Sequence, residues 1–272
     1  MEMIRVDPPG ADLAVICRDA GLASRPPRGT ILFIHGLGDA SSMFGPSMEA
    51  ASLAPYGLAL VDLLGHGLSD KPISFDYTPA SHAAVLFAAL RQLNLPPPLH
   101  LVGFSLGAAV AVELSRFGAV PVGSLVLCEP AVDLNRMEFA RRIVAIPEGA
   151  FADDYGELLQ QYTGPDSTEA DRRWAETAAF AGSRAFYRCA RGLLAAAERG
   201  ELTAHLRESK APKTLILSPQ TYDQWPMART FKQEGARVVL IDSRSKMPMY
   251  ESPDAFYDAV AAAISAGVTP TA

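Results

Sequence analysis

Six short apolar runs, separated by helical patterns, most constrain the fold of this chain of 272 residues. Each run is rich in Val, Ile and Leu and is bounded by Gly, Pro or Asp, which is typical of buried parallel strands. The runs lie at 30–36, 58–63, 99–104, 124–130, 214–218 and 237–242. Helical patterns at 80–93 and 105–118 lie between them. Because strand and helix alternate, we expect a doubly wound, mostly parallel α/β sheet covered on both faces.

The alternation is interrupted once. From about Asp133 to Lys210 the sequence carries only amphipathic helical patterns, including a long one at 171–200. An insertion between two strands of an open α/β sheet lies above the carboxyl ends of the strands, where ligands usually bind. We therefore predict a core of residues 1–133 and 211–272 and a helical lid of residues 134–210. The alternative is an extra packing layer without a gating role.

Composition excludes several classes of protein. The 24 Lys and Arg are outnumbered by 30 Asp and Glu, and no basic run could follow a phosphate backbone, so we expect no nucleic-acid partner. Three widely spaced cysteines indicate neither a disulfide framework nor a zinc site. No basic and apolar leader and no apolar stretch of about 18 residues is present, so we expect a cytoplasmic monomer or homodimer without a membrane partner.

The strongest chemical signal is the pentapeptide GFSLG at 103–107, between a predicted strand and a predicted helix. This context is what the G-x-S-x-G pattern requires, because glycines must flank so tight a turn. Ser105 would then stand at a helix N-terminus, where the helix dipole favours developing negative charge.

Three further motifs appear in order along the chain. HGLG at 35–38 follows the first strong strand, DLLGHGLSDKP at 62–72 follows the next, and MPMYESPDAF at 247–256 follows the last. With GFSLG, they make the chain resemble the α/β-hydrolase superfamily over nearly its whole length. The resemblance implies the α/β-hydrolase fold with Ser105 as nucleophile. It also implies an oxyanion hole formed by the backbone N–H groups of Leu37 and Leu106.

The resemblance fails at the histidine. Members of this superfamily usually carry G-x-G-H-x-P-x-x-E-x-P after the last strand, and here SRSKMPMYESP at 243–253 places Lys246 at the histidine position. The usual acid after the strand at 214–218 is also missing or displaced. We prefer Glu129, which follows the preceding strand, over Asp133 and Asp223 as the acidic partner. Of the five histidines, only His205 in the predicted lid could swing into the site.

A lysine must lose its proton before it can act as a base, so three interpretations stay open. Ser105 and Lys246 could form a nucleophile–base pair for hydrolysis or acyl transfer. A cationic Lys246 could instead stabilise an anion during elimination or cyclisation, as in α/β-hydrolase-like lyases that eliminate acetate from acylated tetronates. The chain could also be a non-catalytic ligand-binding relative. From the sequence we favour the second, on an acidic or carbonyl intermediate of bacterial secondary metabolism.

Loops and lid on the predicted substrate face supply a mostly apolar pocket. The expected partner is a small molecule, possibly acylated and anionic. No phosphate cradle, dinucleotide fingerprint or metal-ligand cluster is present in the sequence, so we expect no cofactor and no metal. The candidate contacts to the substrate are His35, Gly36, Tyr222, Trp225, Met247 and Met249, together with Phe139 and Ile143 from the lid.

Overall fold

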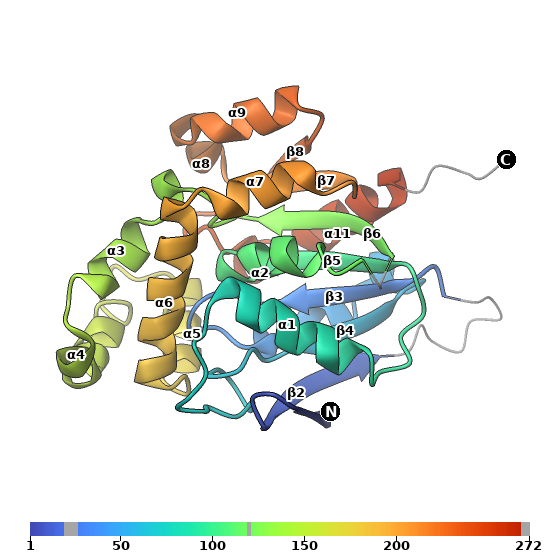
Figure 1. The fold of residues 1–272 in the computed structure, drawn as a ribbon. Coiled ribbons are helices and arrows are strands. Elements are labelled where there is room, and N and C mark those ends of the chain that lie inside the picture. Colours follow the sequence, from blue (N-terminus) through green and yellow to red (C-terminus); the bar gives the residue numbers. More distant parts are fainter. Residues whose placement is uncertain (19–26, 119–120, 268–272) are drawn as a thin grey trace, which may run out of the picture.

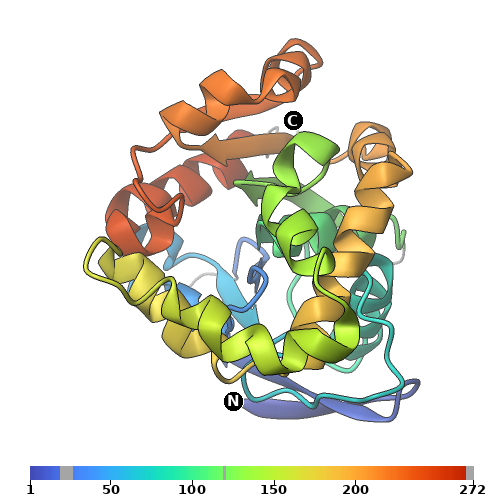
Figure 2. The same cartoon turned by 90° about the vertical axis from the view of Figure 1, so that its left-hand side faces the viewer.

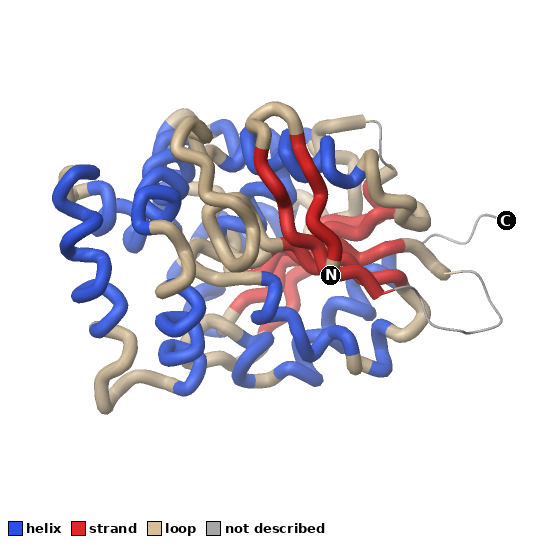
Figure 3. The backbone as a smooth tube through the Cα atoms, turned by 90° about the horizontal axis from the view of Figure 1, so that it is seen from below, coloured by secondary structure: helices blue, strands red, loops and turns tan. Residues whose placement is uncertain are grey.

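The computed structural model describes residues 1–18, 27–118 and 121–267. Within these ranges eight strands form one sheet in the order β1-β2-β4-β3-β5-β6-β7-β8, with helices on both sides (Figures 1 and 3). The strands are β1 (Glu2–Val6), β2 (Ala11–Arg18), β3 (Thr30–Ile34), β4 (Gly57–Val61), β5 (Leu99–Phe104), β6 (Val122–Cys128), β7 (Lys213–Leu217) and β8 (Arg237–Leu240).

Helices occupy most of the remaining described chain. The α-helices are α1 (Pro79–Leu90), α2 (Leu106–Leu114), α3 (Glu138–Val144), α4 (Glu148–Gln160), α5 (Glu169–Ala178), α6 (Ser183–Glu198), α7 (Glu201–Glu208), α8 (Pro219–Gln224), α9 (Pro226–Gln233), α10 (Pro248–Glu251) and α11 (Pro253–Gly267). The 3-10 helices are η1 (Ser41–Met48), η2 (Ala51–Leu53) and η3 (Leu134–Arg136). No described helix is long and apolar enough to cross a bilayer.

The predicted doubly wound, mostly parallel sheet is confirmed. The six apolar runs became β3 to β8, which pair in parallel, and helices α2 and α11 contact the sheet from its two faces. The sequence did not predict β1 and β2, which form an antiparallel hairpin that joins the edge of β4. Burial alternates in β1, where only Ile4 and Val6 are covered, so its pattern lacks the continuous apolar run of a central strand.

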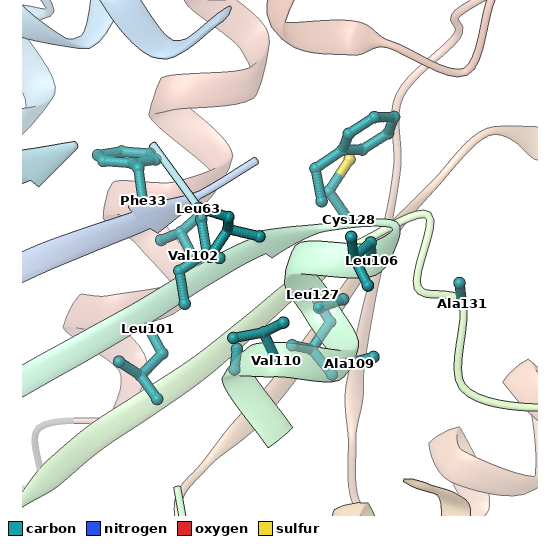
Figure 4. Packing of buried hydrophobic residues seen from close by; sticks show 14 of the residues in the cluster. Phe33, Leu63, Leu101, Val102, Leu106, Ala109, Val110, Leu127, Cys128 and Ala131 are labelled. Atoms are coloured by element: carbon teal, nitrogen blue, oxygen red, sulfur yellow. The ribbon is translucent and has the colours of Figure 1, made fainter. Parts of the chain in front are cut away.

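The core forms where α2 packs on β5 and β6. Every residue of β3, β4 and β5 is buried, and the small side chains of α2 allow its axis to approach the sheet closely. Figure 4 shows Leu106, Ala109 and Val110 of α2 against Leu127 and neighbouring strand residues. The strand ends that carry the chemical motifs are therefore held on a rigid support.

The segment between β6 and β7 is helical, as expected for residues 134–210. Helices α3 to α6 lie beyond the carboxyl ends of the parallel strands, at the left of Figure 1, and Figure 2 views them from that side. The amphipathic helical pattern at 171–200 forms two helices, because the chain leaves α5 after Ala178 and restarts as α6 at Ser183. The division into a core and a lid that gates access stays a prediction.

Two histidines are buried in the core without a charged partner. His82 contacts the Cys189 thiol with Nε2 at 3.4 Å, and His100 contacts Ser124 Oγ with Nδ1 at 2.9 Å. The other ring nitrogen of each has no hydrogen-bond partner among the described residues. Burial lowers the pKa of His82 to about 3 and that of His100 to about 4. Both rings are therefore neutral in the folded protein at pH 7.

These two histidines predict a loss of stability in mild acid. In the unfolded chain they bind protons below about pH 6.5, whereas in the folded protein they bind them only near pH 3 to 4. The free energy of unfolding should therefore be highest above about pH 6.5. Between pH 6 and 4 each histidine should lower it by about 1.4 kcal/mol per pH unit. Urea unfolding at pH 7.5, 6 and 5 measures this slope.

The His100→Gln variant is the control, because an amide can still bond to Ser124. Its slope should be shallower than that of the wild type by about 1.4 kcal/mol per pH unit. Equal slopes for the two proteins in this window would contradict the assignment of His100 as a buried neutral ring.

Candidate active site

Ser105 stands at the sharp turn between β5 and α2. Its backbone has φ 49° and ψ −110°, a region that a residue with a side chain adopts only when its surroundings impose it. The turn is held by Ser105 N–H, which donates to the Cys128 carbonyl at 3.0 Å, and by the Ser105 carbonyl, which accepts from Ala108 and Ala131. The half-buried Ser105 side chain is thereby presented at the end of the sheet.

The glycine after the elbow is required by space. A Cβ on Gly107 would lie 2.1 Å from the Ile34 carbonyl oxygen and 2.5 Å from that of His35. Real Cβ atoms do not approach backbone oxygens so closely, so any side chain at this position would separate α2 from the end of β3. The GFSLG spacing therefore reflects direct contact between the elbow and the HGLG loop.

His35 holds the HGLG loop from beneath. Its Nε2 accepts a hydrogen bond from Leu63 N–H at 2.9 Å, which leaves the proton on Nδ1, 2.7 Å from the Gly36 carbonyl. Burial lowers the pKa of His35 and so favours this neutral form. Both ring nitrogens are used by the backbone, and His35 does not line the pocket beside Ser105. Its part in the structure is to position the loop.

Two backbone N–H groups near Ser105 have no hydrogen-bond acceptor among the described residues. One belongs to Leu37 in the HGLG loop and the other to Leu106 in the first turn of α2. The first N–H groups of any helix lack partners within the helix, and Leu106 is the first residue of α2, so its N–H group is free. Together they are donors of the kind that can bind an oxyanion next to Ser105.

A cavity of about 180 Å³ opens beside Ser105. Its walls come from the core and from the helices above it, and a larger hollow of about 560 Å³ elsewhere does not include Ser105. Trp174 on α5 joins the two sides, because its Nε1–H donates to the Leu37 carbonyl at 2.9 Å. The residues that line the cavity are Leu37, Asp39, Phe104, Ser105, Phe139, Tyr162, Asp171, Trp174, Ser245 and Met247.

Asp39 is a buried acid in this cavity. Its side chain is 1% exposed, and neither carboxyl oxygen has a hydrogen-bond partner among the described residues. Burial raises the pKa of Asp39 well above its usual range, which favours the neutral acid. The sequence analysis did not select Asp39, although it directly follows the HGLG motif.

Lys246 lies in a loop that a glutamate organises. The Glu251 carboxylate accepts hydrogen bonds from Ser243 Oγ, from Arg244 N–H at 2.7 Å and from Ser245 N–H at 3.0 Å. Lys246 has a left-handed backbone with φ 63° and a half-buried side chain. Its neighbours Ser245 and Met247 line the cavity, whereas Lys246 does not. No described residue forms an ion pair or hydrogen bond with its ammonium group.

The predicted acidic partner, Glu129, is bound elsewhere. Its carboxylate pairs with Arg136 at 2.5 Å and also accepts from Ser218 N–H at 2.6 Å and Thr221 Oγ at 2.7 Å. Glu129 is 4% exposed and does not line the cavity. The structure therefore does not bring Glu129 to Lys246. The alternative acids are also engaged, Asp133 with Trp225 Nε1 at 2.7 Å and Asp223 with Arg229 at 3.6 Å.

Other residues selected from the sequence divide between the cavity and its surroundings. Phe139 and Met247 line the cavity. Gly36 lies next to Phe104 and Asp39, two residues of the lining. The remaining four lie outside it. Trp225 is buried against Asp133, Tyr222 stacks under Arg229, Met249 is wholly buried, and Ile143 lines a separate hollow next to α4.

The cavity contains no histidine. All five histidines belong to the described residues, and none is among those that line the cavity. His205 does not swing toward Ser105 in this structure but contacts Glu113 at 2.7 Å. Within the described ranges no group of three or more His, Cys, Asp or Glu side chains could hold a metal ion. The site therefore combines Ser105 at a strand–helix turn with two free backbone N–H groups. Its titratable neighbours are Asp39 and Asp171 in the lining and Lys246 beside it.

Comparison with known proteins agrees with this architecture. Residues 31–259 match a family model described as the alpha/beta hydrolase family. Lipase 1 of Psychrobacter immobilis is 32% identical over 120 residues, which cover 44% of this chain and 36% of the lipase. The chain spans about a third of the length of the curated relatives that it matches first.

Solved structures resemble the chain over nearly its full length. The esterase EaEST of Exiguobacterium antarcticum has a TM-score of 0.76 at 16% identity and covers 97% of this chain and 98% of its own. A carboxylesterase of Nitrososphaera gargenis has a TM-score of 0.79 at 14% identity, with 98% and 100% covered. Identities this low establish the fold alone, and with it the predicted α/β-hydrolase fold is confirmed.

The contacts of Glu129 predict a structural role for its pair with Arg136. Arg136→Leu would leave the buried carboxylate without its cation and should lower the free energy of unfolding by about 3–5 kcal/mol. Asp223→Asn removes an exposed acid and should change it by less than about 0.5 kcal/mol. Chemical unfolding of both variants tests this. A stability change of Arg136→Leu as small as that of Asp223→Asn would contradict it.

Proposed function

Because this chain belongs to the alpha/beta hydrolase family, we propose that it transfers the acyl group of a small ester or thioester to water, with Ser105 as the nucleophile. The observation that carries the proposal is the strained Ser105 backbone at the wall of the cavity, with the free N–H groups of Leu37 and Leu106 beside it. A cavity of about 180 Å³ suits a short acyl chain and a small alcohol.

The first half of the reaction forms an acyl-enzyme. Ser105 Oγ attacks the carbonyl carbon and gives its proton to a base, while the carbonyl oxygen becomes an oxyanion. The N–H groups of Leu37 and Leu106 donate to this oxyanion, which carries charge only as the bond forms. The carbon–oxygen bond to the alcohol then breaks, and the alcohol oxygen takes the proton back from the base.

The second half returns the enzyme to its starting state. Water attacks the acyl carbon and gives a proton to the same base, and a second oxyanion forms between the same N–H groups. The bond to Ser105 breaks, Ser105 Oγ recovers a proton, and the carboxylic acid leaves. A histidine usually serves as the base, but no histidine lines this cavity.

We assign the base to Lys246. It lies between two residues that line the cavity, and no carboxylate among the described residues pairs with its ammonium group to hold it in the charged form. Glu129, the acidic partner preferred from the sequence, is bound by Arg136 instead. A base has to reach only Ser105 at the cavity wall, and the four-carbon side chain of lysine is long and flexible.

Elimination, the function favoured by the sequence, takes second place. It needs a cationic side chain that holds an anionic intermediate, and the residues that line the cavity include no Lys, Arg or His. The free N–H groups next to Ser105 are, in turn, what a tetrahedral intermediate of acyl transfer requires. Esterases and lipases among the similar proteins support the same choice.

The nucleophile can be tested with p-nitrophenyl acetate. Ser105→Ala should lower kcat at least about 10³-fold, because no covalent intermediate can form. Ser115→Ala is the matched control, since Ser115 ends the same helix and its hydroxyl only donates to the Val112 carbonyl. It should turn over like the wild type. Equal rates for Ser105→Ala and wild type would contradict the proposal.

The base can be tested separately. Lys246→Met should lower kcat/KM about 10²- to 10⁴-fold, as expected for loss of a general base, with a change in the free energy of unfolding below about 0.5 kcal/mol. Lys210→Met, at an exposed position, should change neither. Near wild-type turnover of Lys246→Met would remove Lys246 from the mechanism and leave Asp39 as the next titratable group in the cavity.

A further inference from the structure

The proposed acyl transfer makes no use of Asp39. This carboxyl is 1% exposed, lines the cavity with Ser105, and lacks a hydrogen-bond partner for either oxygen among the described residues. Buried polar groups are nearly always paired, because burial without a partner is costly. An unpaired carboxyl that faces a cavity therefore points to a partner that enters with the ligand.

Asp39 lies close to the predicted reacting groups. Its Oδ2 is 3.0 Å from the point where a Cβ on Gly36 would stand, and the Phe104 ring is 2.7 Å from the same point. Gly36 directly precedes Leu37, and Phe104 directly precedes Ser105. A substrate whose carbonyl lies between Leu37 and Ser105 would thus place its adjoining groups near the Asp39 carboxyl.

Three aromatic side chains, Phe139, Tyr162 and Trp174, also line the cavity. The ring of Trp174 lies 5.8 Å from that of Phe139 at 76° and 4.7 Å from that of Tyr162 at 62°. At such steep angles the edge of one ring points toward the face of its neighbour. Ring faces attract cations, and sets of aromatic rings bind quaternary ammonium groups.

The charged residues that line the cavity also favour a cation as ligand. Asp171 adds a second carboxylate, which also caps α5 through Thr168, and the cavity lining includes no Lys, Arg or His. Basic residues lie outside the lining, and one of them, Arg142, forms a side-chain hydrogen bond with Tyr162. Lys246 lies between two lining residues, and the Arg173 guanidinium lies 5.8 Å from the Tyr250 ring with half of its side chain exposed.

We propose that the cavity binds an acyl substrate that carries an ammonium group, with the Asp39 carboxylate as its counter-ion and the rings of Phe139, Tyr162 and Trp174 around it. The acyl part of this inference rests on the proposed function, whereas the ammonium site does not. The expectation from the sequence was an anionic substrate, held by Lys246. The lining residues favour the opposite charge.

Binding of a cation should release a proton. Burial raises the pKa of Asp39, so the neutral acid is favoured until an opposite charge arrives, and a cation nearby lowers that pKa again. The neighbouring Tyr250 stays neutral, because burial and, to a lesser extent, the charge of Asp39 raise its pKa. The other titratable or charged groups at or beside the cavity are Asp171, Lys246, Arg173 and Arg142.

The first experiment measures binding without turnover. Isothermal titration of the intact protein with tetramethylammonium, in two buffers of different ionisation enthalpy, should show saturable binding with release of up to one proton per site. Asp39→Asn should bind at least about tenfold more weakly and release no proton. Asp223→Asn, an exposed acid outside the cavity, should behave like the wild type.

The second experiment compares two esters of the same shape. Acetylcholine and its uncharged carbon analogue, 3,3-dimethylbutyl acetate, differ at the ammonium nitrogen alone. The wild type should prefer acetylcholine by at least about tenfold in kcat/KM, and Asp39→Asn should reduce this ratio to near one. The wild-type ratio and the titration remain decisive if Asp39→Asn does not fold.

The outcomes separate this inference from the proposed function. Ser105-dependent turnover of p-nitrophenyl acetate, with no preference for acetylcholine and no binding of tetramethylammonium, would overturn the ammonium site and leave acyl transfer intact. Binding of tetramethylammonium that depends on Asp39, without hydrolysis of any ester, would support the ammonium site and overturn acyl transfer.

Discussion

The contact between Gly107 and the end of β3 is the constraint on which the site depends. With no side chain at this position, the first turn of α2 reaches the carbonyl oxygens of Ile34 and His35. The same contact brings the Ser105 elbow to the HGLG loop, which His35 holds through two backbone hydrogen bonds. Ser105 and the N–H groups of Leu37 and Leu106 are therefore held at the end of the sheet, on a rigid support for a site.

The walls of the cavity have two origins. Ser105 and Leu37 belong to the sheet and its first loop, whereas Phe139 and Trp174 come from helices that the chain inserts between β6 and β7. A hydrogen bond from Trp174 Nε1 to the Leu37 carbonyl connects the two halves at the cavity. In the proposed function, Ser105 and the two N–H groups would carry out acyl transfer and the inserted helices would contact the substrate, so fold and specificity would be separable.

The sequence predicted what local patterns encode. Buried parallel strands appear as apolar runs and the elbow as GFSLG, so both were found. The antiparallel β1 was missed because only two of its residues are buried. Contacts between residues far apart in the sequence could not be predicted. Trp225, expected at the substrate, is buried instead and donates a hydrogen bond to Asp133, 92 residues away. Asp39 was missed because an acid next to a loop glycine is normally exposed, whereas the folded chain leaves Asp39 only 1% exposed.

The most direct test of the account is a covalent one. Incubation of the intact protein with a fluorophosphonate, which reacts with activated serines, followed by intact-mass spectrometry and peptide mapping, reports whether Ser105 is a nucleophile. The account predicts one adduct per chain, on Ser105, and none after heat unfolding. An unmodified protein, or a label on another residue, would contradict the claim that the elbow, the two free N–H groups and the cavity form an acyl-transfer site.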